Sequence, residues 1–126
     1  MATSQASRDR AVARRRLLLA VLADEEAARL GEPATPAQVA AMARWYRARH
    51  DLLHRRDLDA FLTAVGLRED AFMSQMRSFS HVAAAQHRHM QRIESLIPRY
   101  RAIFGVRDWL VEREGPTDGA PSHDHP

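Results

Sequence analysis

The apolar residues between Glu69 and Ile97 recur at intervals of three, four and seven positions. They are Phe72, Met76, Phe79, Ala83, Met90, Ile93 and Ile97. This spacing places an apolar stripe along one face of an α-helix. Because no proline or glycine occurs before Pro98, the pattern predicts one helix of about 28 residues, roughly 42 Å long. We expect it to be the central helix of the fold, with shorter helices packed on its stripe.

Two further helices are predicted before residue 51. The first runs from about Arg8 to Leu30 and ends at Gly31, a residue type that suits the left-handed conformation after a helix C-terminus. The second begins at residues 35–38 (TPAQ), where threonine suits the N-cap, proline suits the first turn, and glutamine completes a capping box. It runs to about His50.

A third short helix is predicted from Arg55 to Gly66, with apolar residues at positions 58, 61, 62 and 65. Beyond Pro98, a further helical segment carries the apolar residues between positions 100 and 110. Before the tail at 115–126, the Asn-Gly and Asp-Gly dipeptides typical of β-hairpins are absent, and runs of β-branched residues are few. The sequence therefore predicts an all-α fold, a small multi-helix domain.

The predicted domain organisation is simple. A chain of 126 residues has room for one domain with one modest core. We expect a flexible N-terminus at residues 1–7, a single helical domain at 8–114, and a disordered tail at 115–126 (GPTDGAPSHDHP).

The N-terminal part also has some features of an export signal. Three arginines, Arg14 to Arg16, precede a seven-residue apolar run, 17–23. Acidic residues follow at once at 24–26, and the helical pattern continues beyond them. We therefore favour a buried first helix in a cytoplasmic protein, with a cleaved signal within residues 1–23 as the alternative. No apolar stretch is long enough to span a membrane.

Composition excludes several kinds of chemistry. The chain has no cysteine, which rules out disulfides, thiol nucleophiles and thiolate metal sites. All 19 basic residues are arginine, yet the formal net charge is only +3 because acids are interspersed. The strongest basic patch, residues 8–16 (RDRAVARRR), is more typical of a solvated helix start than of a nucleic-acid site.

Two stretches resemble a known family. They are LLLAVLADEEAARLGEPATPAQVAAMARWY and DAFLTAVGLREDAFMSQMR. They are similar to the N-terminal helical domain of SurA-type periplasmic chaperones and parvulin-type prolyl isomerases, over about residues 10–95. The positions that carry the similarity are Gly31, Thr35, Gln38, Val39, Leu58, Leu62, Gly66, Leu67, Phe72 and Met76. The resemblance implies a helical module that holds unfolded or extended polypeptide. We expect no isomerase activity, because the chain has no room for the isomerase domain.

The histidines form no convincing metal site in the sequence. His50 and His54 are four residues apart, which suits a zinc pair only on a continuous helix, and we expect the helix to break between them. On the long helix, His81, His87 and His89 point in different directions or lie too far apart for one ion. We expect these histidines to be exposed or partly packed, and we predict no metal or other cofactor.

Catalytic groups are also missing from the sequence. Ser78 and Ser80 lie near His81, but neighbours on one helix cannot aim a hydroxyl at an imidazole with an orienting acid behind it. Asp57 and Asp59 suit the N-terminus of a helix, where carboxylates are stabilised by the macrodipole. We therefore expect a protein that is not an enzyme.

The surplus of apolar residues on the long helix suggests a binding groove. Methionines adapt to varied partners, so a groove lined by them accepts different peptides. The candidate groove residues are Trp45, Phe61, Phe72, Met73, Met76, Phe79, Met90 and Trp109. Alternatively, the methionines and phenylalanines fill the core. Arg44, Arg47 and Arg49 could pair with an acidic peptide, although a solvated arginine face is the favoured interpretation.

The sequence thus favours a polypeptide-binding helical module, either chaperone-like or an accessory subunit that presents a precursor peptide to a modifying enzyme. One alternative is a transcriptional regulator that binds nucleic acid through the helix at 35–50 or the arginine-rich first helix. Acids interspersed among the arginines disfavour that class. The other alternative is a structural helical homodimer, in which a second copy buries the exposed stripe.

Overall fold

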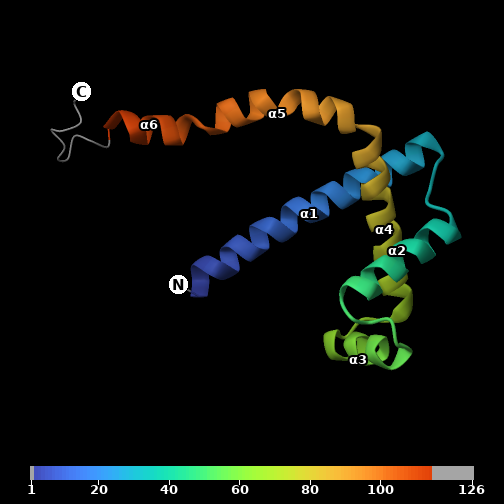
Figure 1. The fold of residues 1–126 in the computed structure, drawn as a ribbon. Helices are drawn as coiled ribbons and strands as arrows, with labels where there is room; N and C mark the ends of the chain where they lie inside the picture. Colours follow the sequence, from blue (N-terminus) through green and yellow to red (C-terminus); the bar gives the residue numbers. More distant parts are fainter. Residues whose placement is uncertain (1, 115–126) are drawn as a thin grey trace. The chain divides into compact units, whose positions relative to one another are not determined.

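The computed structural model describes residues 2–114, and this part of the chain is all-α, with no strand. The helices are α1 (Ala2–Leu30), α2 (Pro36–Arg49), α3 (Arg55–Val65), α4 (Glu69–Arg88), α5 (Met90–Phe104) and α6 (Val106–Glu114). The chain divides into two compact units at residue 89 (Figure 1). The first unit contains α1 to α4, and the second contains α5 and α6. This division falls within residues 8–114, over which the sequence predicts a single domain.

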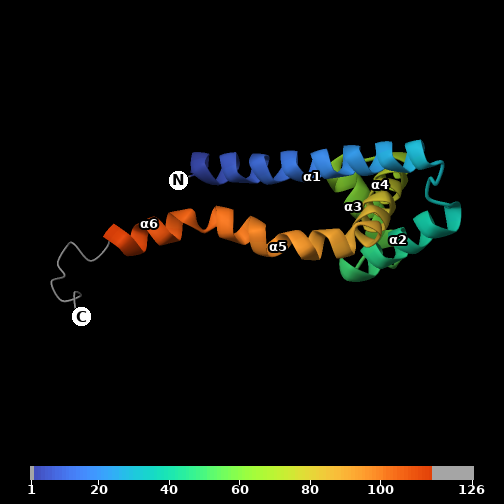
Figure 2. The ribbon, with the colours of Figure 1, turned by 90° about the horizontal axis from the view of Figure 1, so that it is seen from above.

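In the first unit, α4 is the central helix. Both α1 and α2 pack on it, and Figure 2 shows α4 between these two helices. The core combines residues of α2, α3 and α4, which are Val39, Ala43, Leu58, Leu62, Phe72 and Met76. The prediction of short helices packed on a central helix is confirmed. However, α4 has 20 residues and α1 has 29, so the central helix is not the longest.

The helix ends predicted at Gly31, Thr35 and Gly66 are found in the structure. The Thr35 hydroxyl accepts a hydrogen bond from the Gln38 amide at 3.1 Å, and the Gln38 side chain accepts one from the Thr35 amide at 2.9 Å. This is the capping box that the sequence predicts. Gly31 and Gly66 follow α1 and α3 with φ of +68°. The residue after each glycine donates a hydrogen bond back to a carbonyl of the last helical turn, which stops the helix.

The predicted continuous helix from Glu69 to Ile97 is wrong. It breaks at His89, where φ is −104° and ψ is 10°, outside the helical region. A new helix begins at once, because the amide of Ile93 donates to the carbonyl of His89 at 2.9 Å. Pro98 lies inside α5 instead of ending the helix. Proline can stay within a helix at the cost of one hydrogen bond and some bending.

The first helix also differs from the expectation. Its apolar run at 17–22, expected to be buried, is largely exposed, with exposed fractions of 60% for Leu17 and 53% for Leu22. We expected residues 1–7 to be loose and the helix to begin near Arg8, but α1 is helical from Ala2. A hydrogen bond of 3.0 Å from the Gln5 side-chain amide to the Asp9 carboxylate, one turn later, supports its beginning. The tail predicted at 115–126 lies outside the described residues. Between residues 2 and 114, no helix is both long and apolar enough to cross a membrane.

Candidate functional site

A groove runs between α2 and α4, beside the core of the first unit. Its volume is about 990 Å³, and it is open to solvent. Its walls are formed by Gln38, Ala41, Met42 and Trp45 of α2 and by Ser80, His81, Ala83, Ala84, His87 and Arg88 of α4, and its end by residues 32–35 of the preceding loop. We call this feature the α2–α4 groove. Three of its lining residues on the helices are alanines, so a bound chain could approach the helix backbones closely.

The helical period of α2 explains why the groove lies beside the core. Val39 and Ala43 are buried against α3 and α4, while Ala41 and Trp45 lie on the neighbouring face and line the groove. The ring of Tyr46 anchors α2 to α4, because its centroid lies 5.6 Å from that of Phe72 in an edge-to-face arrangement. α2 therefore offers one face to the core and leaves the adjacent face to form a wall of the groove.

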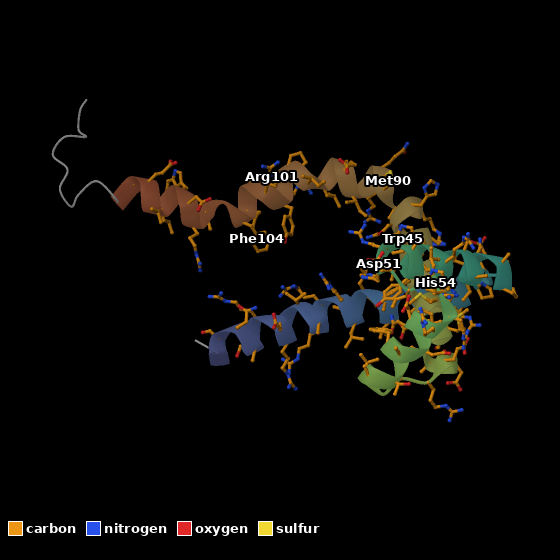
Figure 3. All side chains as sticks on the ribbon, turned by 60° about the horizontal axis from the view of Figure 1, so that its bottom comes forward. Trp45, Asp51, His54, Met90, Arg101 and Phe104 are labelled. Carbon is orange, nitrogen blue, oxygen red and sulfur yellow. The ribbon has the colours of Figure 1, made fainter. Side chains whose placement is uncertain are left out.

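Trp45 is the largest apolar side chain of the groove, and 55% of its surface is exposed (Figure 3). The guanidinium of Arg49, one turn later, lies 5.7 Å from the centre of the indole ring, a distance typical of a cation–π contact. Arg49 therefore restrains the ring in its exposed position. An exposed tryptophan beside an apolar groove is typical of a surface that binds a partner.

The charged residues at one end of the groove are already paired. Arg88 binds the carboxylate of Glu26 at 2.9 Å and lies 3.8 Å from that of Glu32. Arg29 also lies 3.8 Å from Glu26. The pairing leaves little net charge there, so the groove favours an apolar ligand over a strongly charged one.

Beneath the groove, His81 joins three parts of the first unit. Its side chain is only 9% exposed. Nε2 accepts a hydrogen bond from the Ala34 amide at 3.0 Å, and Nδ1 lies 2.8 Å from the Asp24 carboxylate. Since Nε2 is an acceptor, the proton of the neutral ring is on Nδ1 and points at Asp24. Ser78 donates a second hydrogen bond to Asp24 at 2.9 Å.

This cluster has the residue types of a hydrolytic triad but not its connections. In a triad the histidine accepts a proton from the serine. Here Ser78 and His81 both donate to Asp24, and the second nitrogen of the imidazole is occupied by a backbone amide. The arrangement ties α1 and the loop at Ala34 to α4. In residues 2–114, no three histidines, aspartates or glutamates are grouped so that they could hold a metal ion.

The structure separates the residues predicted to line one groove. Trp45 lies in the α2–α4 groove. Phe72 and Met76 are buried in the core, and Phe61 packs partly buried against it, so these three side chains do not form an open surface. For Phe72 and Met76 the alternative, that the stripe fills the core, is correct.

The remaining predicted groove residues lie elsewhere. Met73 packs against the core and lines a smaller hollow on the other side of α2, and Phe79 lines a hollow with α1. Met90 and Trp109 belong to α5 and α6 in the second unit, where both are about half exposed. The α2–α4 groove is therefore a different set of residues from the predicted one.

Sequence reasoning missed most of the α2–α4 groove. Ala41 and Ala84 carry almost no hydrophobic signal, because alanine is common on every face of a helix. Met42 lines the groove but was not among the candidate groove residues. His81 was expected to be exposed or partly packed, and it is buried. Its partners are 47 and 57 residues away, so no local pattern indicates them.

Two other predictions concern the link between α2 and α3. His50 and His54 lie at the ends of α2 and α3, with Asp51 at φ 58° between them, so the helix breaks as expected (Figure 3). Arg47 was a candidate for binding an acidic peptide. Its guanidinium instead donates to the carbonyls of Leu52 and Leu53 at 2.8 and 2.6 Å, which holds the link in place.

No family model, no curated protein and no solved structure matches this chain.

Proposed function

We propose that the first unit is a non-catalytic module that binds an apolar polypeptide segment in the α2–α4 groove. The observation that carries the proposal is the half-exposed ring of Trp45 above a groove with alanine-rich walls. Such a groove suits a short helical or extended segment with small or aliphatic side chains. The sequence resemblance to SurA-type chaperone domains supports the same class of ligand.

The biological role proposed for this module is chaperone-like, or that of an accessory subunit which presents a precursor peptide to a modifying enzyme. The neutralised end of the groove favours apolar segments, which unfolded chains expose. The adaptable side chain of Met42 suits varied sequences. Both features fit a module that binds a class of peptides more than one folded partner.

Nucleic-acid binding is less well supported. The arginines of residues 8–16 lie on one exposed helix, and at about 100° per residue they point in directions all around its circumference. A DNA-binding protein typically has its basic residues clustered on one face. Several other arginines are paired with acids, among them Arg55 with Glu69 and Arg88 with Glu26.

The proposal is tested by comparing two matched variants. Ala41→Glu places a carboxylate in the groove, whereas Ala48→Glu places the same group at an exposed position of α2 that does not line it. The probe is an array of short peptides, from which the strongest apolar binder is taken for titration calorimetry with the full chain. We expect Ala41→Glu to weaken binding by about tenfold or more and Ala48→Glu to leave it unchanged.

A fluorescence measurement provides an independent readout. In a Trp109→Phe background, Trp45 is the remaining tryptophan. Its emission should shift to shorter wavelength when the peptide covers the ring. If Ala41→Glu and Ala48→Glu bind equally well while both remain folded by circular dichroism, the groove is not the binding site. If no peptide binds and DNA is retained with a steep salt dependence, the nucleic-acid alternative holds.

A further inference from the structure

α5 presents an apolar stripe that its own unit leaves uncovered. None of its residues is buried. The exposed fractions are 63% for Tyr100 and 67% for Phe104, and the centroids of the two tilted rings lie 4.5 Å apart. Figure 3 shows Met90 and Phe104 along this helix. A helix this short, with no buried residue, is marginally stable in water and gains stability when a partner covers its stripe.

The spacing of the stripe indicates what kind of partner fits. The residues are Met90, Ile93, Ile97, Tyr100 and Phe104. Their separations are three, four, three and four, which is the repeat of the a and d positions of a coiled coil. This repeat keeps a narrow seam facing another helix along the whole length. The partner is therefore a helix that runs alongside α5.

The residues on the two sides of the seam differ in character. On one side, at the e positions, lie Glu94 and Arg101, one heptad apart and opposite in charge. On the other side, at the g positions, lie Leu96 and Ile103, both apolar and exposed. In an antiparallel pair of helices, e positions face e positions and g positions face g positions. Two antiparallel copies of α5 therefore bring Glu94 opposite Arg101 on one side of the seam and the apolar g residues together on the other.

We propose that α5 pairs with α5 of a second copy of this chain as an antiparallel coiled coil. The two-fold axis passes between Ile97 and Tyr100, so that Ile97 packs on Tyr100 of the partner subunit and Ile93 on Phe104 of the partner subunit. Glu94 then faces Arg101 of the partner subunit on one side of the seam, and this pair occurs twice by symmetry.

A parallel pair does not fit the same residues. In a parallel dimer each g position faces an e position of the following heptad. Leu96 would then face Arg101 of the partner subunit, which sets an apolar side chain against a charge, and Glu94 would face His89 of the partner subunit instead of an arginine. Charge complementarity therefore selects the antiparallel orientation, as it does in natural coiled coils.

The first test uses charge reversal in the full chain, with sedimentation measured over a range of micromolar concentrations. Glu94→Arg places two arginines opposite each other at both ends of the seam, and we expect the dimer to weaken by about tenfold or more. Adding Arg101→Glu restores opposite charges and should restore dimerisation. Arg99→Glu, on the outward face of the same helix, is the matched control and should change little.

The proposal is overturned if the wild-type chain remains a monomer throughout. It is also overturned if Glu94→Arg and Arg99→Glu have equal effects, or if the double variant stays as weak as the single one. Circular dichroism of each variant separates loss of pairing from loss of helix.

The second test measures the orientation of the two helices by disulfide cross-linking. Because the chain has no cysteine, only the introduced cysteines can form disulfides. A mixture of Ile93→Cys and Phe104→Cys chains should form a mixed disulfide under mild oxidation, since these positions meet in the antiparallel dimer. Phe104→Cys alone should not cross-link to itself. The reverse result, efficient self-cross-linking at position 104 without the mixed product, shows a parallel pair and rejects the proposed geometry.

Discussion

Truncation of His81 is the most informative perturbation of the first unit. The imidazole is buried beneath the α2–α4 groove and connects α4 to the Ala34 amide and to Asp24 of α1. His81→Ala removes both hydrogen bonds and leaves the Ala34 amide without this acceptor. The same truncation at His87, an exposed histidine less than two turns further along α4, is the control.

The expected loss of stability follows from the two hydrogen bonds and the packing of the ring. A neutral hydrogen bond contributes about 1 kcal/mol. The bond to the Asp24 carboxylate would contribute more, but 43% of that side chain is exposed, so we count about 1 kcal/mol for it as well. Lost contacts of the buried ring add about 1 kcal/mol. The total is about 3 kcal/mol, whereas His87→Ala should stay within about 0.5 kcal/mol.

Urea unfolding followed by far-UV circular dichroism measures this difference. A double-mutant cycle of His81→Ala with Asp24→Ala should show a coupling of about 1 kcal/mol, because the two side chains are bonded to each other. Nitrogen NMR of the imidazole should show the proton on Nδ1 and not on Nε2. A loss below about 1 kcal/mol for His81→Ala, or a cycle with no coupling, would refute the role assigned to this network.

Two further predictions concern the core and a surface ion pair. Met76 is only 1% exposed, so Met76→Ala should destabilise the first unit by about 2–5 kcal/mol in urea unfolding, and the partly buried Met73→Ala by less; equal losses would contradict this assignment of the core. The pKa of Glu69 is lowered, chiefly because Arg55 donates hydrogen bonds to its carboxylate. A lowered pKa in the folded state adds stability above the pKa of the unfolded state, and this stability is lost as the pH falls through the folded value. Wild type should therefore lose slightly more stability than Arg55→Met between about pH 7 and pH 3, and an identical loss in both would show that the pair contributes nothing.

Local signals in the sequence predicted the helices and their ends well. The capping box at Thr35 and Gln38 and the left-handed glycines, Gly31 and Gly66, act within a few residues of each helix end, so reading the sequence is enough to locate them. The break at His89 has no such signal, because it occurs at a residue that is neither glycine nor proline. Pro98 carries a strong signal for an end, yet the helix continues through it.

The sequence alone determined that the chain is helical, where α2 and α3 start and stop, and which faces are apolar. Only the tertiary structure decided how those faces are used: Met76 in the core, Ala41 and Trp45 in a groove, and Ile97 uncovered on α5. The physical reason is the distance along the sequence over which each interaction acts. Helix formation and capping depend on neighbours along the chain, whereas burial depends on residues tens of positions away, as the bond between His81 and Asp24 shows.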